Sequence, residues 1–311
     1  DLTMSDIPRI KNYLIRINSG MNILHFRSLA PNDFILGEAR DHENNTYEAM
    51  SYYFPDNTGK GKFLPQKLGF RYVGKYPVAT DTINNYSRED WKGNIAFNGY
   101  SVRTDGFQTA WYPVLYDVDL DKQYDQVRYD IEVICDDAKV IYLNGDLPYE
   151  GNRRRFTSKK PVQICLFIGS YKVKNIEGTY FLNPNIDDAG LKNIGDFTNN
   201  VEKYYAENLT IPYGENVVYV NTTPTSKYNS WMFVTFPSIF NISHKGLNDF
   251  ISPKWGKYYK RSFAHEIAHY YFGTYKIFNS GLGDVMSEGF AEYLSMKAVN
   301  QLLGKEIYDE F

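Results

Sequence analysis

Cysteine is scarce in this chain, since Cys135 and Cys165 are the only two among 311 residues. Both lie in apolar stretches typical of strands, and their spacing matches no zinc-binding cysteine pattern. We therefore expect two buried thiols rather than a disulfide, and no cysteine ligand for a metal.

The sequence also lacks an excess of charge of one sign and a long apolar run. Its net charge is −3, which gives no electrostatic reason to expect nucleic-acid binding. The densest basic segment, Arg153–Arg155 with Lys159 and Lys160, is flanked by turn residues, so we favour a solvated hairpin tip over a binding patch.

No apolar stretch approaches the roughly 18 residues that a membrane-spanning helix needs, and we expect no such span. The chain opens at Asp1 with no signal-like segment, which indicates a processed or trimmed chain.

Aromatic residues are abundant by contrast, with 28 tyrosines and 20 phenylalanines. Aromatic side chains pack well on pleated sheets, and a hydrophobic content of 43% suffices for buried cores. A length of 311 residues favours two domains. We therefore expect a two-domain protein that is rich in strands.

Only five histidines are present, and two of them belong to the motif His265-Glu266-Ile267-Ala268-His269. On an α-helix these two imidazoles leave one face about one turn apart, so both can reach a single tetrahedral cation. Glu266 points about 100° away from His265 around the helix, which suits a general base acting on water rather than a ligand. The alternative is an accidental match in an amphipathic helix.

Glu288 follows His269 after eighteen residues, which is room for a loop and the start of a second helix. Such a helix would bring Glu288 back as a third ligand. Two histidines and one glutamate leave a fourth position open for water, as in catalytic zinc sites. The sequence therefore predicts one Zn²⁺ per chain, held by His265, His269 and Glu288.

The segments around these residues extend the match. Ser262–Ala264 precede the motif, Tyr270–Gly273 follow it, and Glu288–Tyr293 read Glu-Gly-Phe-Ala-Glu-Tyr. Here the sequence resembles the gluzincin metallopeptidases, specifically the family of aminopeptidase N. The resemblance implies the same three zinc ligands, the same glutamate as general base, and a peptide or protein substrate. Ser287 departs from the family, which usually has asparagine there.

The fold that this resemblance implies is α+β, with a saddle-like, β-rich N-terminal domain followed by the upper half of a thermolysin-like domain. We place the first domain at residues 1–172 and the second at 173–311, where it is incomplete at its C-terminus. Residues 1–60 give no clear pattern. Elsewhere periodicity and an Asn-Gly turn signal at 144–146 predict helices at about 187–208, 256–272 and 285–303, and strands at 68–73, 127–134, 139–143, 155–157, 162–169, 217–220 and 231–236.

Three features of the family are missing or weak. The family binds the amino group of its substrate through a glutamate in a Gly-x-Met-Glu-Asn strand, whereas Tyr228–Phe236 contain no carboxylate, so exopeptidase specificity is open. The family's oxyanion-stabilising tyrosine lies far beyond the third ligand. This chain ends at Phe311 and its Tyr308 is too close to match, so we expect either truncation or a natural lack of the helical half. Gln108 occupies the place of a substrate-side residue, although a plain turn after a strand explains it equally well.

Two further expectations concern the site and its use. Glu292 lies one turn after Glu288, so it either accepts a hydrogen bond from a ligand imidazole or is a solvated helix glutamate. Substrate backbone is expected to pair along residues 231–236 as an added strand.

The leading hypothesis is a zinc metallopeptidase, because a non-catalytic site has no need of Glu266. The alternative is a zinc-containing binding or scaffold protein on the same fold, which the missing amine-binding glutamate and the missing tyrosine favour. The sequence names no substrate and no compartment, with an extracytoplasmic location preferred to a cytoplasmic one.

Overall fold

The computed structural model divides the chain into two compact units. One unit comprises Asp1–Val127 with Gln163–Leu166, and the other comprises Arg128–Val162 with Phe167–Phe311. Both helices and strands are present, which confirms the α+β class. The residues that the structure describes are 1–28, 39–40, 49–53, 63–76, 97, 101–106, 109–214, 216–221, 232–235, 238–241, 247–276, 278 and 282–311.

These units do not coincide with the two domains expected from the sequence, 1–172 and 173–311. Residues 128–162 group with the part of the chain that carries the helices. Strands also continue beyond residue 172 before the first helix begins, so a change from strands to helices does not mark the division between the units.

Antiparallel pairing builds the first unit. One sheet has the order β1-β6-β3, from strands Leu2–Met4, Leu68–Gly74 and Met21–Ser28. The other has the order β4-β5-β2-β8-β9, from strands Ala39–Arg40, Ala49–Tyr53, Tyr13–Asn18, Val114–Asp117 and Lys122–Tyr124. Two short strands of this unit are β7 (Val102–Thr104) and β10 (Gln126–Val127).

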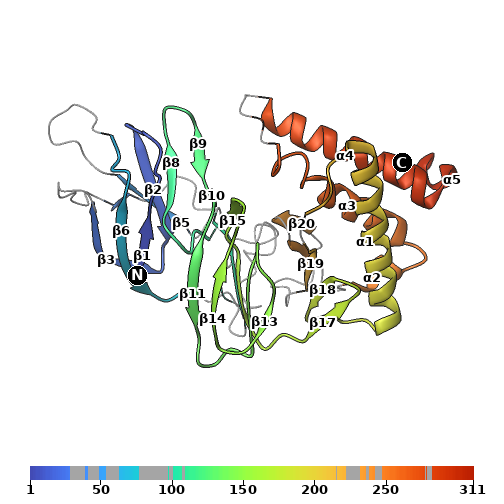
Figure 1. The fold of residues 1–311 in the computed structure, drawn as a ribbon, viewed down its shortest axis with the longest axis horizontal. Coiled ribbons are helices and arrows are strands. Elements are labelled where there is room, and N and C mark those ends of the chain that lie inside the picture. Colours follow the sequence, from blue (N-terminus) through green and yellow to red (C-terminus); the bar gives the residue numbers. More distant parts are fainter. Residues whose placement is uncertain are drawn as a thin grey trace. The chain divides into compact units, whose positions relative to one another are not determined.

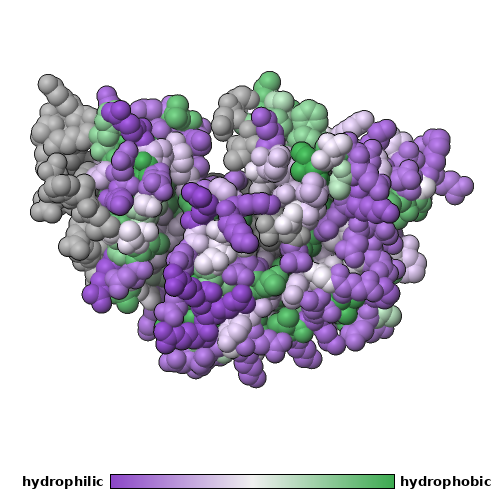
Figure 2. All heavy atoms as spheres, viewed as in Figure 1, coloured by the Kyte–Doolittle hydropathy of each residue, from purple (hydrophilic) through white to green (hydrophobic). Residues whose placement is uncertain are grey.

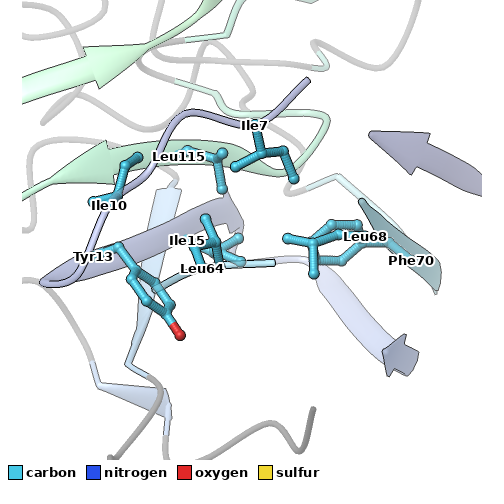
Figure 3. Packing of buried hydrophobic residues seen from close by; sticks show 8 residues of the cluster. All are labelled: Ile7, Ile10, Tyr13, Ile15, Leu64, Leu68, Phe70 and Leu115. Carbon is cyan, nitrogen blue, oxygen red and sulfur yellow. The ribbon is translucent and has the colours of Figure 1, made fainter. Parts of the chain in front are cut away.

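A cluster of apolar side chains joins these two sheets (Figure 3). Leu68 and Phe70 come from β6 in one sheet, and Ile15 and Leu115 come from β2 and β8 in the other; none of the four is more than 3% exposed. Removing branched and aromatic side chains from water is the main favourable term in folding. The cluster is completed by Ile7, Ile10, Tyr13 and Leu64.

The second unit begins with two strand pairs. β11 (Asp130–Ile134) lies antiparallel to β14 (Arg153–Thr157), and β12 (Val140–Leu143) lies antiparallel to β13 (Tyr149–Glu150). The second pair confirms the hairpin expected at the Asn-Gly turn. The chain then passes through the short strands β15 (Val162–Gln163) and β16 (Leu166–Gly169).

Of the basic run expected at a hairpin tip, Arg153–Arg155 lie on strand β14 itself, and Lys159 and Lys160 follow that strand. Its charges are paired across the strand pair and with a neighbouring loop. Arg153 contacts Glu132 at 2.9 Å, and Arg154 contacts Asp146 at 2.9 Å. Cross-strand partners of opposite charge stabilise a sheet, so the Arg153–Glu132 pair supports the pairing of β11 with β14.

A mixed five-stranded sheet is the centre of the second unit, in the order β17-β18-β19-β21-β20. β18, β19 and β21 run parallel to one another, whereas β17 is antiparallel to β18 and β20 is antiparallel to β21. Among the strands that the structure describes, β20 therefore lies at one edge of the sheet. The strands span Val173–Ile176 (β17), Thr179–Leu182 (β18), Val218–Asn221 (β19), Met232–Thr235 (β20) and Ser238–Asn241 (β21).

Helix α1 (Asp188–Leu209) connects β18 to β19. Asp187 caps its N-terminus by accepting a hydrogen bond from the Gly190 N–H at 2.8 Å, as capping aspartates do. The buried face of this helix carries apolar residues at helical spacing, namely Leu191, Ile194, Phe197, Val201 and Tyr205.

The other helices follow the sheet in the chain (Figure 1): α2 (Asn248–Ile251), α3 (Gly256–Ala268), α4 (Gly283–Leu303) and α5 (Lys305–Tyr308). Tyr219 on β19 shows which sheet face α1 and α3 cover. Its hydroxyl lies 2.7 Å from Thr198 Oγ1 on α1, and its ring centroid lies 5.1 Å from that of Phe263 on α3. Both helices therefore pack on the same face of the sheet, and α3 is anchored there through Phe263.

The structure also bears on the expectations for membrane-spanning helices and for the two cysteines. No helix among the described residues has the length and apolar character needed to cross a membrane. Both cysteines are free; Cys165 is buried, as expected, whereas Cys135 is only partly buried.

Candidate metal centre

Helix α3 presents two imidazoles side by side. His265 and His269 lie four residues apart, their ring centroids are 4.8 Å apart, and their Nε2 atoms are 3.1 Å apart. The helix is held in place by Phe263, Ala264 and Ile267, which are fully buried. The anchored helix therefore fixes where both imidazoles point.

The end of α3 differs from the prediction, which extended the helix to about residue 272. The helix ends at Ala268, with His269 as its C-terminal cap. From His269 to Tyr271 each backbone N–H bonds to the carbonyl three residues back, which tightens the last turn. Gly273 then adopts a φ of +118°, a conformation that favours glycine, and the chain leaves the helix there.

This turn supplies a partner for the second imidazole. The carbonyl oxygen of Phe272 lies 3.1 Å from His269 Nδ1 and accepts a second hydrogen bond, at 2.9 Å, from the Ser287 hydroxyl. Sequence reasoning missed both contacts. Gly273 carried a signal that a turn follows the motif, but nothing local indicates which carbonyl would face the imidazole.

Helix α4 brings Glu288 to the two histidines, as predicted from the spacing. Its Oε2 atom lies 3.1 Å from His265 Nε2 and 3.5 Å from His269 Nε2. The Glu288 side chain is 63% exposed. Apolar side chains gather on the surface over the first turns of α4, where Leu282 and Val285 are also exposed (Figure 2). The ligand group is thus open on one side.

Glu292, one turn further along α4, resolves the alternative left open by the sequence. Its Oε2 atom lies 3.1 Å from His265 Nδ1, and the Ser295 hydroxyl donates to the same oxygen at 3.4 Å. It is therefore a partner of the imidazole rather than a glutamate that contacts only solvent. Carboxylates in this position fix the orientation of a ligand imidazole and raise its basicity.

These contacts define the tautomers of both rings. A carbonyl oxygen only accepts hydrogen bonds, so the Phe272 carbonyl requires a hydrogen on His269 Nδ1. The Glu292 carboxylate requires the same of His265 Nδ1. In the neutral imidazoles both Nε2 atoms therefore carry lone pairs, and these lone pairs face each other and the Glu288 carboxylate. Three acceptors at such distances repel one another unless a proton or a metal cation lies among them.

The spacing of the three acceptors fits such a cation. A tetrahedral zinc ion with bonds of about 2.0–2.1 Å separates its ligand atoms by about 3.3–3.4 Å. The three distances observed here are 3.1, 3.1 and 3.5 Å. Two imidazoles and one carboxylate are also a ligand set that zinc takes in hydrolytic enzymes. The residues present therefore fit a zinc ion in both chemistry and size.

The surroundings of His265 favour the neutral form of its imidazole. Burial lowers the pKa of the His265 imidazole below its usual value, and the neighbouring His269 lowers it further. A lowered pKa keeps the ring neutral near pH 7, and only the neutral ring can coordinate a cation.

Glu266 stands apart from the ligand group. The group of possible ligands that the structure identifies in this region contains His265, His269 and Glu288 and leaves Glu266 out. Glu266 is partly buried on α3 beside His265. A residue one position along a helix points about 100° away from its neighbour, so Glu266 flanks the group without joining it.

The remaining predicted residues fall partly outside the described chain. Gln108, Tyr228–Trp231 and Phe236 are not among the described residues. Of the predicted substrate strand, Met232–Thr235 are described and form β20, at the sheet edge. α3 is in contact with this strand, so the helix with the two histidines adjoins the last strand in the described order of the sheet.

Comparison with known proteins adds no relative, because no protein-family model and no curated protein matches the chain.

Proposed function

We propose that this protein is a zinc-dependent metallopeptidase, with a catalytic unit similar to the upper half of a thermolysin-like domain and a β-rich N-terminal region like that of the aminopeptidase N family. The observation that carries the proposal is the cluster of three acceptors, His265 Nε2, His269 Nε2 and Glu288 Oε2, at 3.1–3.5 Å. Such a cluster needs a proton or a metal cation among its atoms, and its spacing matches that of ligands around zinc.

The chemistry would be divided between the ion and the chain. A zinc ion held there would lower the pKa of a water molecule toward neutrality and polarise the scissile carbonyl. In that reaction Glu266 would accept a proton from the attacking water and pass it to the nitrogen of the leaving amine as the C–N bond breaks. The partly buried position of Glu266 beside His265 suits a group that must act on the water without binding the ion.

Substrate binding is proposed along the edge strand β20. An extended peptide can add to an exposed sheet edge through backbone hydrogen bonds, which hold it without regard to side-chain identity. Support comes from the sheet order, which ends at β20, and from the contact of β20 with α3. A peptide on this edge would lie next to the helix that carries two of the proposed ligands and the proposed base.

The specificity follows from what the strand region lacks. Tyr228–Phe236 contain no carboxylate, so this segment offers no charge partner for the amino group of a substrate. A buried or partly buried cation needs such a partner. We therefore propose hydrolysis within peptides, or at termini that need not be free, rather than strict removal of N-terminal residues.

The test combines metal content with turnover. Protein purified without added metal should contain about one zinc per chain and cleave an unstructured peptide; a chelator should remove both properties, and zinc should restore both. Glu288→Gln should lose zinc and activity together, because it removes one ligand charge. Glu306→Gln, on α5 and also exposed, is the matched control and should retain both. Protein that stays metal-free in excess zinc would refute the proposal.

A second candidate function is a zinc-containing binding or scaffold protein on the same fold. The observation that favours it is the missing carboxylate in Tyr228–Phe236, which removes a recognised substrate contact. The two functions differ in one outcome. Zinc at full occupancy with no cleavage of any peptide in a diverse library, at any pH between about 5 and 9, would select the scaffold.

A further inference from the structure

We propose that Arg261 is a positioning residue that sets the metal affinity of this site by fixing Glu292 against the ligand His265. The inference rests on the proposed metal centre but not on peptide hydrolysis. Arg261 lies on α3 one turn before His265, and its guanidinium forms an ion pair with Glu292 Oε1. The other oxygen of the same carboxylate faces His265 Nδ1 at 3.1 Å.

Each oxygen of the Glu292 carboxylate has its own partner. Glu292 is a long side chain on a helix surface and is 39% exposed, so water competes for both of its oxygens. Holding such a flexible side chain in one position costs conformational entropy. Arg261 engages Oε1 through a charge-assisted contact, which leaves Oε2 directed at the imidazole. The carboxylate is therefore already in place when the ion binds.

The guanidinium itself is held from several sides. Its central carbon lies 5.0 Å from the ring centroid of Phe311, and its side chain is 34% exposed. The Nε atom of Arg261 is buried and has no hydrogen-bond partner among the described residues. An unsatisfied buried donor is costly, and exposed ion pairs return little of that cost. A pair formed only for stability would be poorly placed here, whereas a pair that orients Glu292 accounts for the arrangement.

Arg261 also acts through its charge. Glu288 and Glu292 place two carboxylates around one imidazole, and Arg261 offsets the charge of the one that is not a proposed ligand. Lysine cannot replace it fully, because its ammonium is a compact point charge on a flexible stem rather than a planar fork. We expect lysine to preserve part of the effect through its charge and to lose the part that depends on geometry.

The test measures zinc affinity, by competition with a chromophoric chelator, in the full chain. Arg261→Gln should weaken zinc binding about tenfold or more, as loss of outer partners of metal ligands does, and Arg261→Lys should lie between this variant and the parent. Cobalt substitution gives a second readout, since the visible spectrum of bound Co²⁺ reports ligand geometry and should change in Arg261→Gln. The matched control is Lys257→Gln, which removes an ion pair with Glu310 one turn earlier on α3 and should leave affinity unchanged.

The route through Glu292 is tested by a double-mutant cycle. Glu292→Gln alone should weaken zinc binding. Adding Arg261→Gln to it should lower the zinc affinity almost no further, because the carboxylate through which Arg261 acts is already absent. The proposal would be overturned if Arg261→Gln lowered zinc affinity equally with and without Glu292, or lowered it in neither background. It would also be overturned if the variants lost zinc affinity in proportion to their loss of thermal stability in the metal-free state. Parent protein that binds zinc but cleaves no peptide would refute the proposed hydrolysis alone, and the affinities would still decide the role of Arg261.

Discussion

The hydroxyl of Ser287 donates a 2.9 Å hydrogen bond to the carbonyl of Phe272. That carbonyl also accepts from His269 Nδ1 at 3.1 Å, so the residue just before Glu288 steadies the turn that orients the other helix's imidazole. The two imidazoles thus have unlike partners, a carbonyl for His269 and a carboxylate for His265.

Ser287→Ala should weaken zinc binding by up to about tenfold, because the Phe272 carbonyl would lose one of the two contacts that fix it. Zinc affinity measured by chelator competition checks this. Ser262→Ala is the control; Ser262 is exposed on α3 and donates to the Tyr258 carbonyl at 3.1 Å. Equal affinities of Ser287→Ala and the parent would show that the turn needs no support from α4.

Gly273→Ala should destabilise the protein by about 1–3 kcal/mol, because its φ of +118° strains any other residue. A Cβ there would also lie 2.8 Å from Ser287 Oγ. The free energy of unfolding from a urea titration of the metal-free protein measures the cost. Gly289→Ala, at a helical position with nothing within 4 Å of the added Cβ, should be neutral or stabilising by up to about 1 kcal/mol. A smaller cost at Gly273 than at Gly289 would contradict the account of this turn.

Glu202 on α1 should make stability depend on pH. Burial raises the pKa of its carboxyl from 4.5 to about 8. Between these values the folded protein retains a proton that the unfolded chain has released, so the free energy of unfolding should fall as pH rises from about 5 to about 8. Glu202→Gln should remove this decline, as followed by urea titration at several pH values. Glu207→Gln, an exposed position on the same helix, should leave the decline as in the parent; parallel curves for Glu202→Gln and the parent would contradict the prediction.

Blocking the N-terminus of a peptide substrate should cost little activity, because Tyr228–Phe236 provide no carboxylate to bind a free amine. The comparison is kcat/KM for one peptide in its free and acetylated forms. A preference for the free form of more than about tenfold, or about 1.4 kcal/mol, would mean that an acidic residue elsewhere binds the amine.

The parts of the site that the sequence predicted are those governed by local geometry. His265 and His269 face the same way because four residues make about one helical turn, and Glu288 follows within the next helix. Arg261 and the Phe272 carbonyl escaped notice because their partners lie on another helix or in a turn, and no spacing rule specifies such contacts. The end of α3 at Ala268 was not predicted. The aromatic residues 270–272 continue the apolar pattern of a helix, but in the structure these residues form tight turn hydrogen bonds and Gly273 turns the chain away.

In the fold, too, the elements with a strong local pattern were predicted, and those that depend on distant partners were not. α1 and α4 were predicted nearly to their ends because long amphipathic or apolar periods are strong signals. The strands before residue 60 were not predicted. β1 pairs with β6, and β2 pairs with β8, so each gains its stability from a partner far along the chain. Short strands of this kind have little local pattern, since packing against neighbours decides them. The predicted change at residue 172 marked the approach to α1, whereas the compact units divide after Val127.

The most direct test of the account is a paired measurement on Glu266→Gln, of zinc content and of peptide turnover in the same preparation. Glu266 is placed outside the ligand group, so the variant should keep about one zinc per chain with parent-like affinity. Its turnover should fall by at least about a hundredfold, within the range that a general base contributes. Retained turnover would contradict the role of Glu266 as base, and loss of zinc together with activity would contradict its position outside the metal centre.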